Sequence, residues 1–416
     1  MGFDLDNASI ALFGKLKEKS FRCFKGITNK SIDSKIIKTF INVYMKYMKD
    51  DKETNQIIRT VKELFMKNIK NNRELSNLID KYLIPQELEK KSNAEISTPF
   101  KLRQEMLDKI PVEFWTSIKK VFEPCVGKGG FIVDIIDRFM NGLEEAIPDE
   151  KLRYKTIVED CLYFSDINPT NIFICKLLID PYNEYNLNYN EGNTLELDIK
   201  EKWDIGGFDA VIGNPPYVLC QPSNTNEITL NYYKSYEVAS YKIDLFHLFF
   251  EKSISILSSN GKLGFITPNT YLNNKYIKPL RSFILKHTSI NTVLNYKDEV
   301  FVGAGVDVAT IVLTKNKKPT NNIKLIEVEN LIEKSLGSKP QVLWEQDKEN
   351  VFNLNKELGI NFTGCIALSD ICTSYFGIQA YDRKSSVTSN RINADHLPII
   401  DGGDISEFAY TTPTKY

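Results

Sequence analysis

From about residue 119 to residue 315, short apolar runs alternate with stretches of helical periodicity. This alternation limits the possible folds of the chain more than any other feature. Runs with the length and composition of strands lie at 121–123, 162–165, 210–212, 263–266, 293–296 and 309–313. Helical patterns lie between most of them, at 132–140, 168–179 and 244–257. The alternation predicts an α/β fold with a doubly wound, mostly parallel sheet. No clear helix separates the last two strands, so we expect an antiparallel hairpin at one sheet edge.

Two further regions flank this part of the chain. In residues 1–95, apolar side chains recur at helical spacing, which predicts an N-terminal helical region. The stretch 317–322 has the composition of a linker, and no sustained period follows it. We therefore expect three parts, 1–95, 96–318 and 319–416. Residues 411–416 resemble the middle of a domain, so we expect the last part to be truncated.

Composition argues against several classes of protein. The net charge of -1 gives no overall attraction to a polyanion, so any nucleic-acid surface must be local. Residues 1–95 carry an excess of Lys and Arg, which fits either a solvated helical face or a phosphate-contacting patch. Seven cysteines without a CxxC pair indicate a reducing compartment, and three histidines argue against a multi-histidine metal site. With no signal peptide and no membrane-spanning run, we expect a cytoplasmic protein without a bound metal.

The tetrapeptide Asn214-Pro215-Pro216-Tyr217 follows the apolar run 208–213. Two successive prolines cannot continue the hydrogen bonding of a strand, so the tetrapeptide is expected to form a stiff turn at the carboxyl end of that strand. Open α/β sheets bind their ligands at this edge. The turn offers an amide side chain, a carbonyl group and an aromatic face, which suit a planar base that bears an exocyclic amine.

A glycine-rich turn, with Gly127 and Gly129, follows the first strand. Glycines allow close approach of a ligand to the backbone, and the following helix start offers N–H groups. Glu123, at the strand end, would repel a pyrophosphate but suits the ammonium group of an amino-acid ligand. A tight turn with an exposed glutamate is the alternative interpretation.

Three other positions are candidates for contacts with a nucleoside. Asp166, at the tip of the second strand, is placed to accept hydrogen bonds from two ribose hydroxyls. This requires that Asn168 rather than Asp166 caps the next helix. Asn193 is a candidate partner for an adenine amine, although a plain Gly-Asn turn fits it nearly as well. Phe301 fits either the second wall of a base slot or a core position.

Taken together, these motifs resemble the S-adenosylmethionine-dependent DNA adenine-N6 methyltransferases in which a target-recognition domain follows the catalytic domain. The resemblance covers about 96–315, and Ser97-Thr98-Pro99 resembles the upstream motif of that family. It implies a Rossmann-like class I methyltransferase fold, with the start of the recognition domain in 319–416. The implied catalytic residues are Asn214, Pro215, Pro216 and Tyr217, and the implied base-stacking residues are Tyr217 and Phe301. The implied cofactor contacts are Thr98, Pro99, Glu123, Pro124, Gly127, Gly129, Asp166, Ile167, Asn193 and Asn214.

The resemblance further implies direct transfer of a methyl group from S-adenosylmethionine to the N6 amine of a flipped adenine. Double-stranded DNA would be the substrate, and a restriction endonuclease that acts on the same site would be a partner. Two positions depart from the family pattern: Lys128 replaces a small residue, and Asn193 replaces a more usual aspartate.

Other functions remain open. Asn-Pro-Pro-Tyr also occurs in methyltransferases that act on rRNA bases or on a glutamine of a translation factor, but those chains tend to be shorter. Cytosine-N4 methylation uses the same chemistry, usually with serine before the prolines. A DNA-recognition subunit without activity and a nicotinamide dehydrogenase fit the motifs less well.

Overall fold

The computed structural model describes most of the chain from Ser97 onward and divides it into two compact units, Met1–Lys356 and Glu357–Tyr416. The helical region expected at 1–95 and the expected N-terminal basic patch lie outside the described residues. The described residues are 97–180, 183–240, 242–301, 305–330, 332–355, 364–366, 368–373, 387–400, 405–406, 409–410 and 415.

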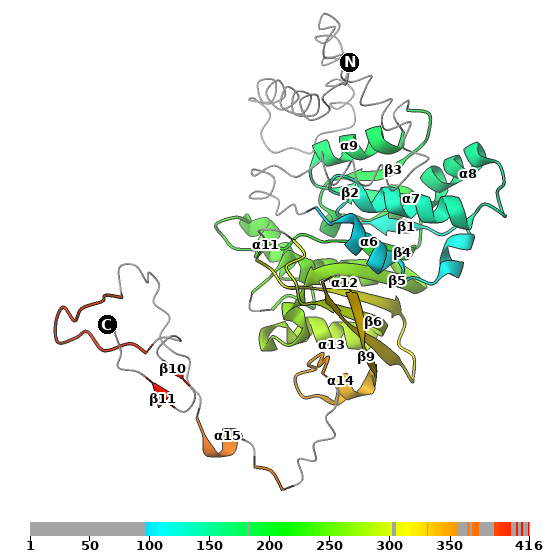
Figure 1. The fold of residues 1–416 in the computed structure, drawn as a ribbon. Helices are drawn as coiled ribbons and strands as arrows, with labels where there is room; N and C mark the ends of the chain where they lie inside the picture. Colours follow the sequence, from blue (N-terminus) through cyan, green and yellow to red (C-terminus); the bar gives the residue numbers. More distant parts are fainter. Residues whose placement is uncertain are drawn as a thin grey trace, which may run out of the picture. The chain divides into compact units, whose positions relative to one another are not determined.

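In the described residues, the first unit contains a nine-stranded sheet with the order β3-β2-β1-β4-β5-β7-β6-β8-β9 (Figure 1). Strands β3, β2, β1, β4 and β5 are parallel, whereas β7 runs antiparallel to both β5 and β6. The expected doubly wound, mostly parallel sheet is confirmed. The strands are β1 (Val121–Glu123), β2 (Leu162–Asp166), β3 (Asn188–Glu191), β4 (Phe208–Gly213), β5 (Leu257–Pro268), β6 (Thr288–Tyr296), β7 (Val308–Lys315), β8 (Asn322–Glu329) and β9 (Ile332–Pro340).

The predicted position of the hairpin is wrong. Strands β6 and β7 do pair antiparallel, but β6 also pairs with β8, and β9 follows β8. The linker-like stretch 317–322 is therefore a connection between strands of one sheet, and the boundary expected at 318 lies inside the first unit. Most of β9 is exposed and carries charged side chains, so it lacks the apolar alternation by which a strand is recognised in a sequence.

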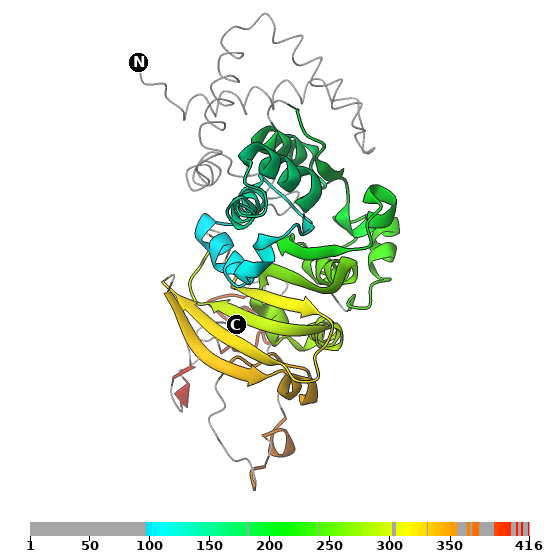
Figure 2. The same ribbon diagram turned by 90° about the vertical axis from the view of Figure 1, so that its right-hand side faces the viewer.

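Two hydrophobic clusters cover the two faces of the sheet because successive strand residues point to opposite sides. Val121 and Ala210 face the cluster that contains α6, α7 and α9, and Phe122 and Val211 face the cluster that contains α12 and α13 (Figure 2). The helices are α6 (Phe100–Leu107), α7 (Gly130–Gly142), α8 (Glu150–Thr156), α9 (Pro169–Ile179), α10 (Ile199–Trp203), α11 (Glu227–Tyr233), α12 (Leu245–Ile256), α13 (Lys278–His287) and α14 (Val342–Gln346).

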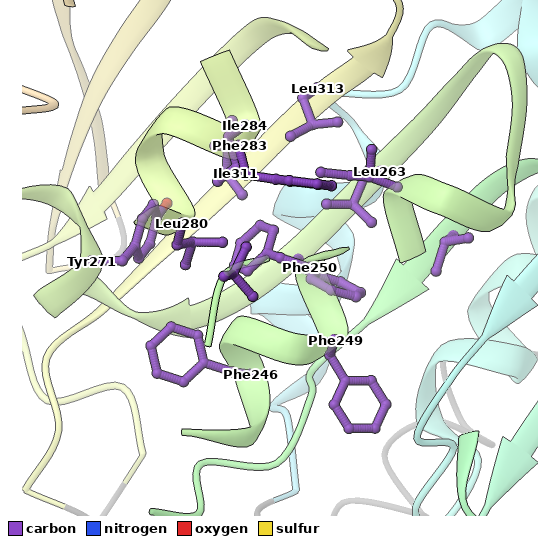
Figure 3. Close-up of a cluster of buried hydrophobic side chains, with 14 of the residues drawn as sticks. Phe246, Phe249, Phe250, Leu263, Tyr271, Leu280, Phe283, Ile284, Ile311 and Leu313 are labelled. Atoms are coloured by element: carbon purple, nitrogen blue, oxygen red, sulfur yellow. The ribbon is translucent and has the colours of Figure 1, made fainter. Parts of the chain in front are cut away.

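Helix α12 shows how the second face is built. Phe246, Phe249 and Phe250 are buried and belong to the same hydrophobic cluster as the sheet residues Leu263 and Ile311 (Figure 3). The Phe250 ring contacts Phe265 on β5, and the Phe246 ring contacts Tyr217 in the tetrapeptide that follows β4.

The second unit contains the short helix α15 (Leu368–Ile371) and an antiparallel pair, β10 (Ile405–Ser406) and β11 (Ala409–Tyr410). An isolated bridge joins Ile399 to Lys415. Across all described residues of the chain, no helix combines the length and the hydrophobicity needed to cross a bilayer.

Candidate functional site

A pocket opens at the carboxyl ends of the parallel strands, where the sequence placed the candidate motifs. Its lining includes the predicted residues Pro124, Gly127, Asp166, Ile167, Asn193, Asn214, Pro215, Pro216 and Tyr217. Thr98, Pro99, Glu123, Gly129 and Phe301 are not part of the lining. Four predicted segments, distant from one another in the sequence, therefore meet at one edge of the sheet, as expected for an open α/β fold.

The lining also includes residues to which the sequence did not point, Asn171, Tyr233 and Phe249. Phe249 lies one helical turn after the lining residue Leu245, so helical periodicity could have identified it. Lys128, which departs from the family pattern, donates a hydrogen bond to Asn171 Oδ1 at 2.8 Å. Tyr233 comes from the segment between β4 and α12, and no sequence pattern singles it out.

The glycine-rich turn requires its glycines. Gly127 and Gly129 have φ angles of 51° and 87°, in the left-handed region. A Cβ atom on Gly129 would lie 3.0 Å from Leu178 Cδ1, so a side chain there would also crowd α9. The turn places the Gly127 N–H 2.9 Å from Asp166 Oδ2, which joins the ends of β1 and β2.

Glu123 is buried, with 2% of its surface exposed, so the interpretation of this position as an exposed glutamate in a tight turn is wrong. Its Oε2 atom has no hydrogen-bond partner among the described residues. Burial raises the pKa of the carboxyl well above its usual range, and the nearby Arg103 charge partly opposes that rise. An unpaired buried oxygen of this kind is costly unless a donor or a cation binds it.

Asp166 is not free, contrary to the prediction. Its Oδ1 accepts a hydrogen bond from the Asn168 backbone N–H at 2.8 Å, and its Oδ2 accepts the bond from Gly127. Asp166 thus connects the segment before α9 with the glycine-rich turn, and its contact with a ligand stays a prediction.

Asn193 lines the pocket, but its side chain also shapes the local turn. The Oδ1 atom accepts a hydrogen bond from the Leu195 N–H at 3.1 Å and caps the short helix η3 (Thr194–Glu196). The Nδ2 atom donates to the Tyr233 hydroxyl at 3.2 Å. The interpretation of this position as a Gly-Asn turn therefore describes the Asn193 Oδ1 atom correctly. A contact between Asn193 and a ligand stays a prediction.

The amide side chain of Asn214 is held at both ends. Its Nδ2 donates to Thr98 Oγ1 at 3.0 Å, and its Oδ1 accepts a hydrogen bond from the Tyr217 hydroxyl at 2.6 Å. The Tyr217 hydroxyl also lies 3.1 Å from the Ile266 carbonyl oxygen. Burial raises the pKa of Tyr217 well above its usual range, so this hydroxyl stays protonated and remains a donor.

The ring of Tyr217 makes edge-to-face contacts with Phe246 and Phe301, with centroid distances of 6.2 and 6.5 Å. Phe301 is only 3% exposed and belongs to the hydrophobic core. A base that stacks between two rings needs both rings parallel to it, whereas Tyr217 and Phe301 are inclined by 65°. In this structure Phe301 therefore has the core position that the sequence left open, and its stacking role stays a prediction.

Gly130, at the start of α7, provides a stability test of this region. A Cβ atom there would lie 2.8 Å from the guanidinium carbon of Arg103, which an ion pair with Asp134 holds in place. We expect Gly130→Ala to lower the free energy of unfolding by about 1–3 kcal/mol, measured by urea denaturation, because α7 or Arg103 must shift. Gly206→Ala is the matched control, since nothing lies within 4 Å of its added Cβ. Equal stability of the two variants would contradict the packing described here.

Comparisons with known proteins found similar sequences among restriction-modification methyltransferases. A family model described as Eco57I restriction-modification methylase matches residues 160–301. The type II methyltransferase M.PaeR7I from Pseudomonas aeruginosa is 28% identical over 195 residues, which cover 43% of this chain and 32% of that protein. M.AccI from Acinetobacter calcoaceticus is 24% identical over 277 residues, which cover 65% of this chain and 46% of that protein. The chain thus spans less than half the length of these two relatives.

A solved structure from a type I restriction-modification system has a similar fold, with a TM-score of 0.52 at 14% identity. The similarity covers 78% of this chain and 72% of that chain. At this level of identity the likeness concerns the fold alone, and it supports the α/β fold described above.

Proposed function

We propose that this chain, whose residues 160–301 match the family model of the Eco57I restriction-modification methylases, transfers a methyl group from S-adenosylmethionine to the N6 amine of an adenine in DNA. The observation that carries the proposal is the position of Asn214-Pro215-Pro216-Tyr217. The tetrapeptide lines the pocket at the end of β4, with the Asn214 amide oriented by two hydroxyl groups. The motif begins with asparagine rather than the serine typical of cytosine-N4 enzymes.

The residues of the site fit this cofactor. The unpaired Glu123 Oε2 suits the ammonium group of the methionine end, since a cation offsets the cost of a buried carboxylate. Asp166 and Asn193 line the pocket where the ribose and adenine would lie, and the exposed side chain of Ile167 offers an apolar surface for the ring. When bound, the cofactor supplies a methyl group activated by a sulfonium.

The residues of the chain contribute mainly by positioning. The lone pair of an adenine amine is delocalised into the ring, so the amine is a weak nucleophile. Hydrogen bonds from the amine to Asn214 Oδ1 and to the Pro215 carbonyl favour a pyramidal nitrogen and localise its lone pair. Two prolines restrict the backbone that carries these acceptors, so little reorganisation accompanies the reaction.

The adenine must leave the duplex to reach this pocket, and the Tyr217 ring provides a face on which it can stack. A stacking role for Phe301 requires its ring to leave the core position seen here. The unit that begins at Glu357 is the candidate for the target-recognition domain, and a restriction endonuclease with the same DNA site is the proposed partner.

Cofactor affinity should depend on pH through Glu123. The raised pKa means that the carboxyl of the cofactor-free protein ionises only above the usual pH range of a glutamate. Because the ammonium group attracts only the ionised form, we expect the Kd for S-adenosylmethionine to fall as the pH rises above that usual range. Calorimetric titration checks this, with Glu123→Gln as the control, for which we expect weaker and nearly pH-independent binding. A wild-type Kd that rises with pH would contradict this role.

The class of substrate can be tested with a labelled methyl group. The chain is incubated with radiolabelled cofactor and, in parallel, with double-stranded DNA, ribosomal RNA or translation factors. We expect label in the DNA alone. Label in ribosomal RNA or in a translation factor instead would replace the proposal with one of the other functions of this motif.

A further inference from the structure

Thr98 belongs to the segment predicted to contact the cofactor, yet it is 7% exposed and does not line the pocket. Its hydroxyl oxygen accepts a hydrogen bond from Asn214 Nδ2 at 3.0 Å, across 116 positions of sequence. Thr98 therefore contacts the side-chain amide of Asn214, which is the group proposed to bind the substrate amine.

A buried ion pair holds the Thr98 backbone in place. The Arg103 guanidinium donates a short hydrogen bond to the Thr98 carbonyl oxygen, and its Nε lies 2.5 Å from Asp134 Oδ2. Arg103 and Asp134 are each 1% exposed, so water does not screen this pair. Arg103 lies on α6 and Asp134 on α7, so the segment before α6 is tied to the helix that starts at the glycine-rich turn.

The opposite end of the Asn214 amide is held by the Tyr217 hydroxyl, which itself has a second acceptor within reach. A substrate amine that approaches Asn214 Oδ1 must share or displace that hydroxyl. During such an exchange, the bond to Thr98 is the contact that keeps the amide in position.

We propose that Thr98 is a positioning residue for methyl transfer, which holds the Asn214 amide while the Arg103–Asp134 pair holds Thr98. The inference rests on the proposed function of Asn214. It implies that Thr98 affects the rate of the chemical step rather than the affinity for the cofactor. A short displacement of the Asn214 amide is enough to lose the orientation that the reaction needs.

The test compares Thr98→Val with Thr98→Ser. Valine has the shape of threonine without the hydroxyl, and serine keeps the hydroxyl. At saturating cofactor, we expect the single-turnover methylation rate to fall about tenfold in Thr98→Val and to stay within about twofold of wild type in Thr98→Ser. The Kd for S-adenosylmethionine, measured by calorimetry, should be unchanged in both variants.

Three results would overturn the inference. A Thr98→Val variant with the wild-type rate would show that the bond to Asn214 has no role in the reaction. A raised cofactor Kd with an unchanged rate at saturation would make Thr98 a cofactor contact. The crystal structure of Thr98→Val gives a readout without activity, in which we expect a displaced Asn214 amide, and an undisplaced amide also counts against the inference. A wild-type chain that methylates no acceptor would instead refute the proposed function.

Discussion

Replacing Asn214 with alanine is expected to lower methyl transfer at least about 100-fold while leaving the Kd for S-adenosylmethionine nearly unchanged. The variant loses the side-chain oxygen that accepts a hydrogen bond from the substrate amine, and the Pro215 carbonyl alone cannot fix the geometry of the nitrogen. The variant also loses the hydrogen bonds of the Asn214 amide to Thr98 and Tyr217. This loss affects the part of the pocket proposed to hold the substrate amine. Single-turnover assays and calorimetric titration of the cofactor measure the two effects separately.

Asn141→Ala is the matched control for this substitution. Asn141 is exposed near the far end of α7, and its Nδ2 donates to the Asp137 carbonyl oxygen, so the same change of side chain occurs away from the pocket. We expect this variant to retain wild-type transfer. If Asn214→Ala kept more than a tenth of the wild-type rate, or lost cofactor binding with full turnover per bound complex, Asn214 would not be the group that binds the amine.

Replacing Arg103 with alanine is expected to lower the free energy of unfolding by about 3–5 kcal/mol, because the Asp134 carboxylate stays buried and loses its counter-charge. The substitution also removes the donor to the Thr98 carbonyl oxygen. Urea denaturation of the chain measures the change.

An exposed ion pair provides the contrast. Lys200 and Asp204 form an i,i+4 pair on the surface, with side chains 72% and 85% exposed. Lys200→Ala should cost less than about 1 kcal/mol, since water screens the charges and side-chain entropy offsets the attraction. The double variant Arg103→Met with Asp134→Leu should recover much of the stability lost by Arg103→Ala, because it leaves no unpaired charge. Equal losses from Arg103→Ala and Lys200→Ala would contradict the buried position of the pair.

The sequence predicted the central sheet well because its strands are buried on both faces and appear as continuous apolar runs. It failed at β8 and β9, where one strand is mostly exposed and charged. The composition of a short loop inside one sheet resembles that of a linker between domains, which explains the misplaced boundary at 318.

The site was predictable where backbone chemistry dictates it. Two prolines must end a strand, and glycines with positive φ must form a turn, so Asn214 and Gly127 could be placed at the pocket from sequence. The hydrogen-bond and packing partners of each side chain could not be predicted from the sequence. The bonds of Asp166 to the turn, the core position of Phe301 and the bond between Thr98 and Asn214 depend on three-dimensional packing between distant segments.

Mass spectrometry of nucleosides tests the central claim most directly. DNA is isolated from cells that express the chain and from cells that express the Asn214→Ala variant, and both samples are digested to nucleosides. The account predicts N6-methyladenine in the first sample at a level well above that in the second. N4-methylcytosine in place of N6-methyladenine, or equal N6-methyladenine in both samples, would contradict it.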